Sequence, residues 1–288
     1  MKEVKHYKAL AISTRYWKPN DDYIAFIIEA VKGKLRNGDI VTVSEKAIST
    51  SSSSIIDESK AKSSRTAVFM AKYWMPISWG YILGPFCHLR KETIQRFKNY
   101  PTKEGAQHKQ VALQYAGFLQ ALMHGSEGGI DGSNLPYAYV SLTLQNAPKN
   151  AQKIQKTIQK TLGRKVTVLI VDTDKTYSLG SFHFTPRPEP IKGIHSNYGV
   201  FAYVIGRFLK LRNRATPIAI AGKSLSTEEA LNIAMIAHKA RGSGAGSTVW
   251  DMAEKFDVAL TKVSWNMLAE IEHKPVVIVR AVKGKIFA

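Results

Sequence analysis

The sequence has almost no cysteine and no long hydrophobic run. Its one cysteine, Cys87, excludes an internal disulfide and a zinc site built from cysteines alone. Cys87 follows the apolar stretch 79–86, so we expect it to be a small buried side chain. No apolar segment approaches the roughly 20 residues needed to cross a bilayer. Residues 1–5 lack the apolar core of a signal peptide. These absences predict a soluble, cytoplasmic protein.

Acidic residues are also scarce. Asp and Glu number 22 against 41 Lys and Arg, which gives a formal net charge of +19. Such an excess of positive charge attracts anionic partners, including nucleotides, anionic small molecules and nucleic acid, although it also increases solubility. The 288 residues, of which 44% are hydrophobic, suffice for one large domain or two modest ones.

Two of the few acids follow patterns that are typical of binding sites. Asp131 lies in the glycine-rich segment 128–134, where a ligand could approach the backbone closely. Asp172 follows the β-branched run 166–171, which predicts a buried strand, and begins the loop Asp172-Thr173-Asp174. Carboxylate and hydroxyl oxygens suit Mg²⁺ or Mn²⁺ with bound phosphates. The alternative is that both segments are turns that close strands.

Helical and extended patterns alternate irregularly along the chain. A capping box formed by Ser226 and Glu229 begins one predicted helix, and Gly163 ends another. Segments 108–114 and 118–123 predict a β-hairpin, and the serine-rich run 49–54 is either a flexible loop or a phosphate cradle. Further helices are expected at 20–31, 64–75 (ended by Pro76), 91–100, 151–162 and 198–209, and strands at 9–13, 40–43, 137–144, 216–221 and 275–282.

Three segments carry a resemblance to a known family. GIDGSN (residues 129–134) resembles the GIDxSN loop of the coenzyme F420-0:γ-glutamyl ligase family, and LIVDTD (169–174) resembles its ITDTxGR segment. The stretch 38–49 is similar to the family's GDVLVVxQKIVSK. The three matches keep the family's order and similar spacing, and the resemblance extends loosely over residues 9–282.

The resemblance implies an α+β fold with mixed or antiparallel sheets and packed helices, and an intertwined homodimer. It implies a ligase of coenzyme F420 biosynthesis that uses GTP and Mg²⁺ or Mn²⁺ to add L-glutamate to an anionic acceptor. No catalytic residue is assigned. The implied metal ligands are Asp131, Asp172 and Thr173, and the implied nucleotide contacts are Asn134, Ser49, Thr50, Arg241, Gly242, Ser243 and Gly244.

The chain also departs from the family pattern. Thr50 stands where the family has a nucleotide-binding lysine, and Ala240 stands where it has a metal-binding glutamate. The family's Arg-rich loop after the second acid retains only Lys175 and Gly180. These departures leave two alternatives: a homologue that binds RNA or another polyanion without ligase activity, and a ligase for a different anionic acceptor.

The domain organisation is predicted from a proline-rich connector at residues 186–190. It divides the chain into an N-terminal α+β part, 1–185, which contains both acidic loops, and a C-terminal α+β part, 186–288, which contains the glycine-rich loop. The alternative is one continuous ligase-like domain.

Overall fold

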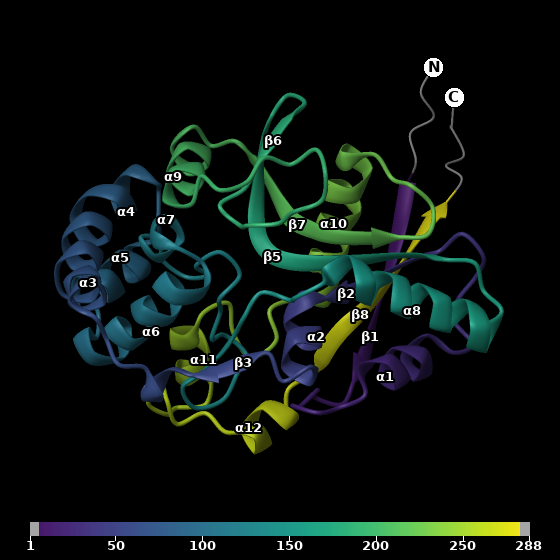
Figure 1. Cartoon of the computed structure of the whole chain (residues 1–288), viewed down its shortest axis with the longest axis horizontal. Helices are drawn as coiled ribbons and strands as arrows, with labels where there is room; N and C mark the ends of the chain where they lie inside the picture. Colours follow the sequence, from purple (N-terminus) through teal and green to yellow (C-terminus); the bar gives the residue numbers. More distant parts are fainter. Residues whose placement is uncertain (1–5, 283–288) are drawn as a thin grey trace.

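The computed structural model describes residues 6–282, and a mixed six-stranded sheet forms its centre (Figure 1). The strand order is β1-β8-β2-β5-β6, and β7 also pairs with β5. β2 and β5 run parallel, whereas the other pairs are antiparallel, which confirms the predicted α+β class with a mixed sheet. The strands are β1 (His6–Thr14), β2 (Ile40–Ser44), β5 (Thr167–Leu179), β6 (Phe182–Phe184), β7 (Arg212–Ala221) and β8 (His273–Val282); β3 (Ile55–Asp57) pairs separately with β4 (Tyr139–Ser141).

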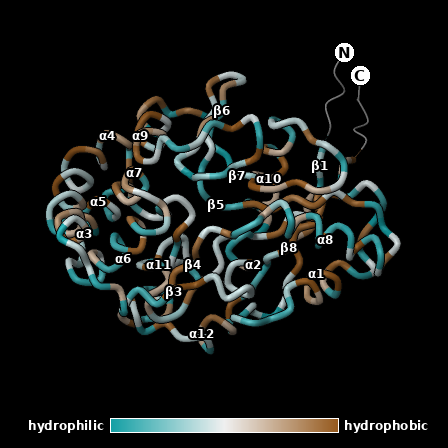
Figure 2. Tube along the Cα trace, viewed as in Figure 1, coloured by the Kyte–Doolittle hydropathy of each residue, from teal (hydrophilic) through white to brown (hydrophobic). Residues whose placement is uncertain are grey.

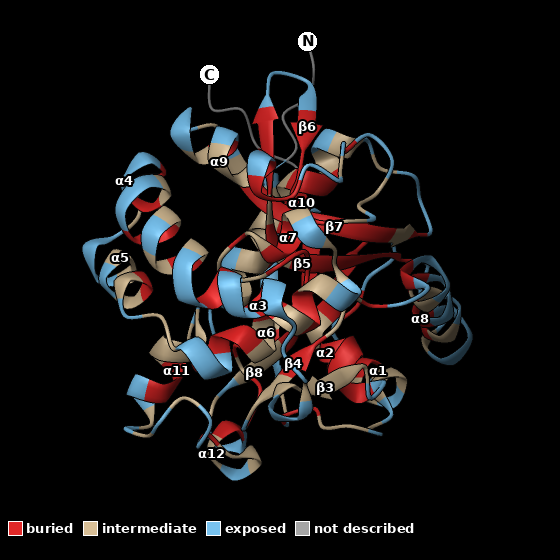
Figure 3. Ribbon diagram, turned by 60° about the vertical axis from the view of Figure 1, so that its left-hand side comes forward, coloured by how far each residue is buried: buried red, intermediate tan, exposed pale blue. Residues whose placement is uncertain are grey.

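The central strands β5 and β7 are mostly buried, as their red ribbons show (Figure 3). Val168 and Ile170 of β5 pack with α1 and α8 on one face, while Leu169 and Val171 pack with α10 on the other. Fully burying each such side chain stabilises the fold by roughly 1.5–3 kcal/mol. The covering helices are α1 (Tyr23–Val31), α8 (Ala147–Leu162) and α10 (Thr227–Arg241). Strands from both sides of residue 186 therefore share one core.

A helical lobe lies beside the sheet and has its own core, in which Trp79 and Cys87 are fully buried as expected. Within residues 6–282, no helix is both long and apolar enough to cross a bilayer. The lobe contains α3 (Arg65–Phe69), the wide π-type helix η2 (Met70–Leu83), α4 (Gly84–Phe86), α5 (Lys91–Lys98), α6 (Thr102–Tyr115), α7 (Phe118–Ala121) and α9 (Val200–Phe208). Smaller helices are α2 (Glu45–Ser51), η1 (Glu58–Lys60), α11 (Val249–Lys255) and α12 (Trp265–Ala269).

The predicted hairpin at residues 108–123 is wrong, because this segment forms α6 and α7. The buried residues of α6 include Ala106, Lys109 and Ala112, which recur at helical spacing. Because this buried set includes Lys109, the apolar residues alone do not show the helical spacing. The helix end predicted at Pro76 is also wrong, because helix η2 continues past this residue. Its π-type turns are wider than those of an α-helix and lack the regular hydrogen bonds to the fourth preceding residue that a proline interrupts.

The serine-rich run is also more regular than a flexible loop. α2 extends to Ser51, and the hydroxyls of Thr50 and Ser51 donate to carbonyls four residues earlier. These bonds satisfy the hydroxyl groups within the helix. The helix expected at 20–31 begins at Tyr23, because the Asp22 carboxylate accepts from two backbone N–H groups and caps it.

The segment Asp172–Asp174 does not form the loop that we expected after a strand. β5 continues through it to Leu179, but its register against β7 shifts between Asp172 and Lys175. Asp172 pairs with Thr216 and Lys175 with Ala215, so Thr173 and Asp174 have no partners in the ladder. Such bulges re-aim side chains and occur often beside functional sites.

Candidate functional site

A cavity of about 880 Å³ lies where the sheet meets the helical lobe. This volume is in the range of small-molecule sites. The bulge of β5, the loop at Asp131, the end of α10 and part of α6 all contribute to its wall. Both predicted acidic segments therefore line the same cavity.

Lys46, the second residue of α2, holds the Asp131 loop. Its ammonium group donates to the Asp131 carboxylate, and also to the backbone carbonyl and hydroxyl of Ser133 at 2.8 and 2.9 Å. The Ser133 N–H donates to Asp131 Oδ1 at 2.7 Å, which closes a tight turn. The sequence assigned no role to Lys46, because the family's nucleotide-binding lysine falls at Thr50, but Lys46 is the cation that balances Asp131.

Arg187 holds the second acid. Its guanidinium donates to Asp172 Oδ2 at 2.5 Å and to Glu45 Oε1 at 2.6 Å, and its side chain is 3% exposed. Burial raises the pKa of Glu45 to about 7, an effect that Arg187 opposes and Asp172 reinforces. The sequence had shown Arg187 only as part of a connector, and its position between two prolines was the one available signal.

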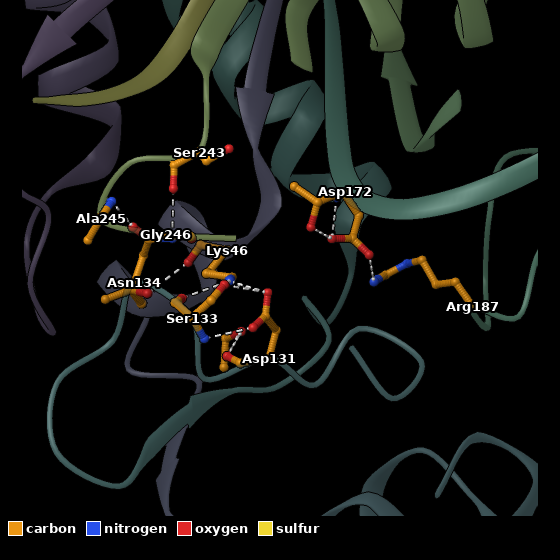
Figure 4. Close-up of polar contacts among 12 residues, drawn as sticks. Lys46, Asp131, Ser133, Asn134, Asp172, Arg187, Ser243, Ala245 and Gly246 are labelled. Atoms are coloured by element: carbon orange, nitrogen blue, oxygen red, sulfur yellow. Dashed lines mark hydrogen bonds and ion pairs between the residues drawn. The ribbon is translucent and has the colours of Figure 1, made fainter. Parts of the chain in front are cut away.

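The two aspartates therefore share a cavity, but each is turned to its own cation. Figure 4 shows Asp131 beside Lys46 and Ser133, with the Asp172–Arg187 pair on the other side. Gly129 makes the second pair possible, because a Cβ on this residue would lie 2.2 Å from Arg187 Nη1. Its φ of +98° is a second reason for glycine.

Asn134 connects the first acidic loop to the glycine-rich loop after α10. Its side-chain amide donates to the carbonyls of Ser243 and Gly246 and accepts from the Ala245 N–H at 2.6 Å (Figure 4). A Cβ at Gly244 would lie 2.5 Å from Asn134 Oδ1. The contacts of Asn134 in this structure thus hold the loop in place.

The other predicted nucleotide contacts are distributed unevenly. Four residues at the end of α10 and beyond it line the cavity: Arg241, Gly242, Ser243 and Gly244. Thr50 also lines it, whereas Ser49 is fully buried in α2 and is not among the lining residues. Ala240 packs beside the core between α10 and the sheet.

The donor set of the two loops fits a hard divalent ion only in part. Asp131, Asp172 and Thr173 offer the oxygen ligands that Mg²⁺ and Mn²⁺ prefer. Among the described residues, however, no three side chains of His, Cys, Asp or Glu surround a common point. Because Mg²⁺ is usually held by one or two carboxylates together with phosphates and water, these residues fit an ion that arrives with a nucleotide.

A buried charge network on α6 forms another part of the wall. Lys109 donates to Glu127 at 2.6 Å, and the His108 ring bridges Glu127 and Glu58 at 2.8 and 2.5 Å. Burial disfavours a charged His108, but the two carboxylates outweigh it and raise the His108 pKa well above its ordinary value. The sequence gives no signal for this network, because the hairpin predicted for this segment does not place its side chains as α6 does.

Comparison with known proteins identifies a matching family and a relative, each covering most of the chain. Residues 11–248 match the sequence family described as F420-0:Gamma-glutamyl ligase. The uncharacterized protein MJ1361 of Methanocaldococcus jannaschii is 36% identical over 285 residues, which cover 95% of this chain and 96% of that protein. The match includes both acidic segments and the glycine-rich loop.

We predict that Arg187→Met lowers the free energy of unfolding by about 3–5 kcal/mol, because Glu45 and Asp172 then lose a buried partner. Urea unfolding measures this change. Arg212→Met is the matched control, since its ion pair with Glu228 is exposed and is worth about 1 kcal/mol or less. Equal effects of the two substitutions would contradict the central role of Arg187.

Proposed function

This chain belongs to the F420-0:γ-glutamyl ligase family, and we propose that it uses GTP to join L-glutamate to a phosphorylated acceptor such as coenzyme F420-0. The observation that carries the proposal is the shared cavity, in which both acidic segments of the family pattern meet the glycine-rich loop. The cytoplasmic location expected from the sequence stays a prediction.

Amide formation requires an activated carboxylate. The γ-phosphoryl group of GTP is transferred to the acceptor carboxylate, and the glutamate amine then displaces phosphate from the acyl phosphate. For such a reaction the protein mainly positions reactants and balances charge. The cavity suits both tasks, because its acids are held rigidly by Lys46 and Arg187.

Phosphate oxygens would meet the end of α10 and the loop that follows it. Arg241 lines the cavity, where the charge of Asp172 acts on its guanidinium, and it would also attract the phosphate groups of a ligand. The backbone N–H groups of the glycine-rich loop could add donors. Asn134 fixes the shape of this loop and so would act on the nucleotide through it.

Asp131, Asp172 and Thr173 are the residues that would hold a divalent ion. When bound, Mg²⁺ or Mn²⁺ would neutralise phosphate charge during phosphoryl transfer. The carboxylate and hydroxyl oxygens of these residues would be the ligands. Lys46 and Arg187 balance the negative charges of the two carboxylates and so reduce the repulsion between them.

The family match does not favour the alternative of a polyanion-binding homologue without ligase activity. The excess of lysine and arginine agrees equally well with anionic small-molecule substrates. The acceptor itself stays open, and other phosphorylated carboxylates belong in the same assay as coenzyme F420-0.

An exposed apolar face on the helical lobe supports the homodimer that the resemblance implies. Tyr81 and Ile82 of η2 are 63% and 61% exposed, and Phe86 stacks on Phe208 of α9 with ring centroids 3.9 Å apart. Figure 2 shows hydrophobic segments along α4 and α9 at the edge of the lobe. Exposed patches of this kind mark interaction surfaces.

We predict ligation in a mixture of the purified chain, coenzyme F420-0, GTP, Mn²⁺ and L-glutamate. Mass spectrometry should detect an acceptor that has gained one glutamyl residue, together with GDP and phosphate. Asp131→Asn should lower the rate about 10- to 100-fold, as loss of support for a bound metal does. Glu104→Gln, an acid on the cavity wall with no described partner, is the control and should retain the rate. Absence of nucleotide-dependent product with every acceptor tested would reject the proposal.

The dimer gives a separate prediction. Sedimentation velocity should give twice the 32.0 kDa mass of one chain, and Ile82→Glu should shift the protein toward monomer because it buries a charge in the apolar face. Lys72→Glu, at a polar position of the same helix, is the control. A single-chain mass for the unaltered protein at all concentrations would contradict this assignment.

A further inference from the structure

Much of the excess positive charge lies outside the cavity. The residues that line the cavity include eight Asp or Glu but only five Lys or Arg. By contrast, the 40 residues between Asp131 and Asp172 include six Lys or Arg and no acid. All six lie in α8 or directly after it, so this helix carries a charge that the proposed reaction leaves unexplained.

The lysines of α8 form a single row along the helix. Four exposed lysines recur at intervals of four, three and four residues: Lys149, Lys153, Lys156 and Lys160. Such spacing places them on one face of an α-helix. At roughly 100° per residue, this face lies opposite the buried residues Ala151, Ile154 and Ile158. The lysine row therefore points away from the core and into solvent.

The basic surface continues beyond the end of α8. The Lys165 N–H donates to Asn37 Oδ1 at 2.9 Å, so the segment after α8 lies against the connection between α1 and β2. Five further exposed cations lie on these two segments: Lys32, Lys34, Arg36, Arg164 and Lys165. The neighbouring chain thus adds to the positive charge of the lysine row.

The acids that lie beside α8 belong to its flank and not to the row. Asp22 and Glu29, at the start and within α1, share a shallow groove with Thr157 and Thr161 of α8. The two threonines lie roughly 100° around the helix from the lysine row. Because α8 itself contains no acid, its outward face keeps the full charge of its lysines.

A row of this shape fits a linear polyanion. It extends over roughly 16 Å, since an α-helix rises about 1.5 Å per residue. Duplex nucleic acid carries one negative charge per about 1.7 Å of its axis, so several phosphates can face the row at once. Gln152 and Gln159, which are exposed beside the lysines, can donate further hydrogen bonds to phosphate oxygens.

The composition of α8 separates this partner from two others. Proteins bind single strands largely by stacking bases on aromatic side chains, and α8 has no aromatic residue. A helix that inserts into a membrane surface needs a free apolar face. The apolar residues of α8 are instead buried against the sheet. Duplex phosphates are thus the partner that this face matches best.

We propose that the lysine row of α8 is a docking surface for duplex nucleic acid, which it holds through the phosphates. No residue of α8 lines the cavity, and Figure 1 shows α8 on the side of the sheet remote from the helical lobe. The surface is therefore separate from the proposed ligase site, and one chain can carry both. Because phosphate contacts carry no sequence information, binding should not depend on base sequence.

Fluorescence anisotropy of a labelled duplex of about 20 base pairs, as DNA and as RNA, tests the surface over a range of salt concentrations. The unaltered chain should bind at about 50 mM salt. Combining Lys149→Gln, Lys153→Gln, Lys156→Gln and Lys160→Gln should weaken binding about 10- to 100-fold. The slope of log K against log salt should fall in magnitude by about 3 to 4, because four phosphate contacts are lost.

A matched control removes the same charge from scattered positions. It replaces four exposed lysines outside the row by Gln: Lys62, Lys91, Lys192 and Lys262. This variant should lose less than about 3-fold in affinity, since it alters only the overall field. Arg at the four positions of the row should retain binding. Helicity and Tm should be the same in all variants, because Lys, Arg and Gln have similar helix propensities.

Three results would overturn the docking surface. They are no binding of either duplex at low salt, equal losses in the two Gln variants, and binding only to vesicles of phosphatidylcholine with phosphatidylserine, which would assign the row to a membrane. The outcome is distinguishable from that of the ligase assay. Duplex binding without ligation would retain the surface and reject the proposed reaction, whereas ligation without duplex binding would do the reverse.

Discussion

The pairing of one buried guanidinium with two carboxylates determines how the cavity is built. Arg187 contacts Glu45, which begins α2, and Asp172, which lies at the bulge of β5. It also passes so close to Gly129 that no side chain fits there. Segments separated by more than a hundred residues are thereby fixed around one charge, and both acidic loops reach the same cavity. Removing Arg187 would leave the carboxylates of Glu45 and Asp172 buried without a cation, and this destabilises a fold more than replacing the whole group by apolar side chains.

Local signals in the sequence were enough to predict much of the sheet and its covering helices. The capping box of Ser226 and Glu229 begins α10, and Gly163 ends α8 with a φ of +64°. The β-branched run 166–171 lies in β5 from Thr167 onward, where it is buried on both faces. Each of these signals acts within a few residues, so a single sequence contains all the information needed.

Long-range pairing could not be predicted in the same way. The Lys109–Glu127 pair places a charge in the interior of α6, and this charge interrupts the apolar period that would have identified the helix. Likewise, the motifs located Asp131 and Asp172 but not Lys46 and Arg187, since a counter-charge can come from any segment that the fold brings near. The bulge at Thr173 and Asp174 depends on the register of β7, which no local pattern specifies.

We propose that the cavity holds a nucleotide whose phosphates would bind a divalent ion together with Asp131 and Asp172. Electron paramagnetic resonance of Mn²⁺ titrated into the chain, with and without GDP, tests it most directly. The arrangement of two cation-held carboxylates predicts weak Mn²⁺ binding alone and much tighter binding with GDP. Mn²⁺ affinity that GDP does not change would contradict the account.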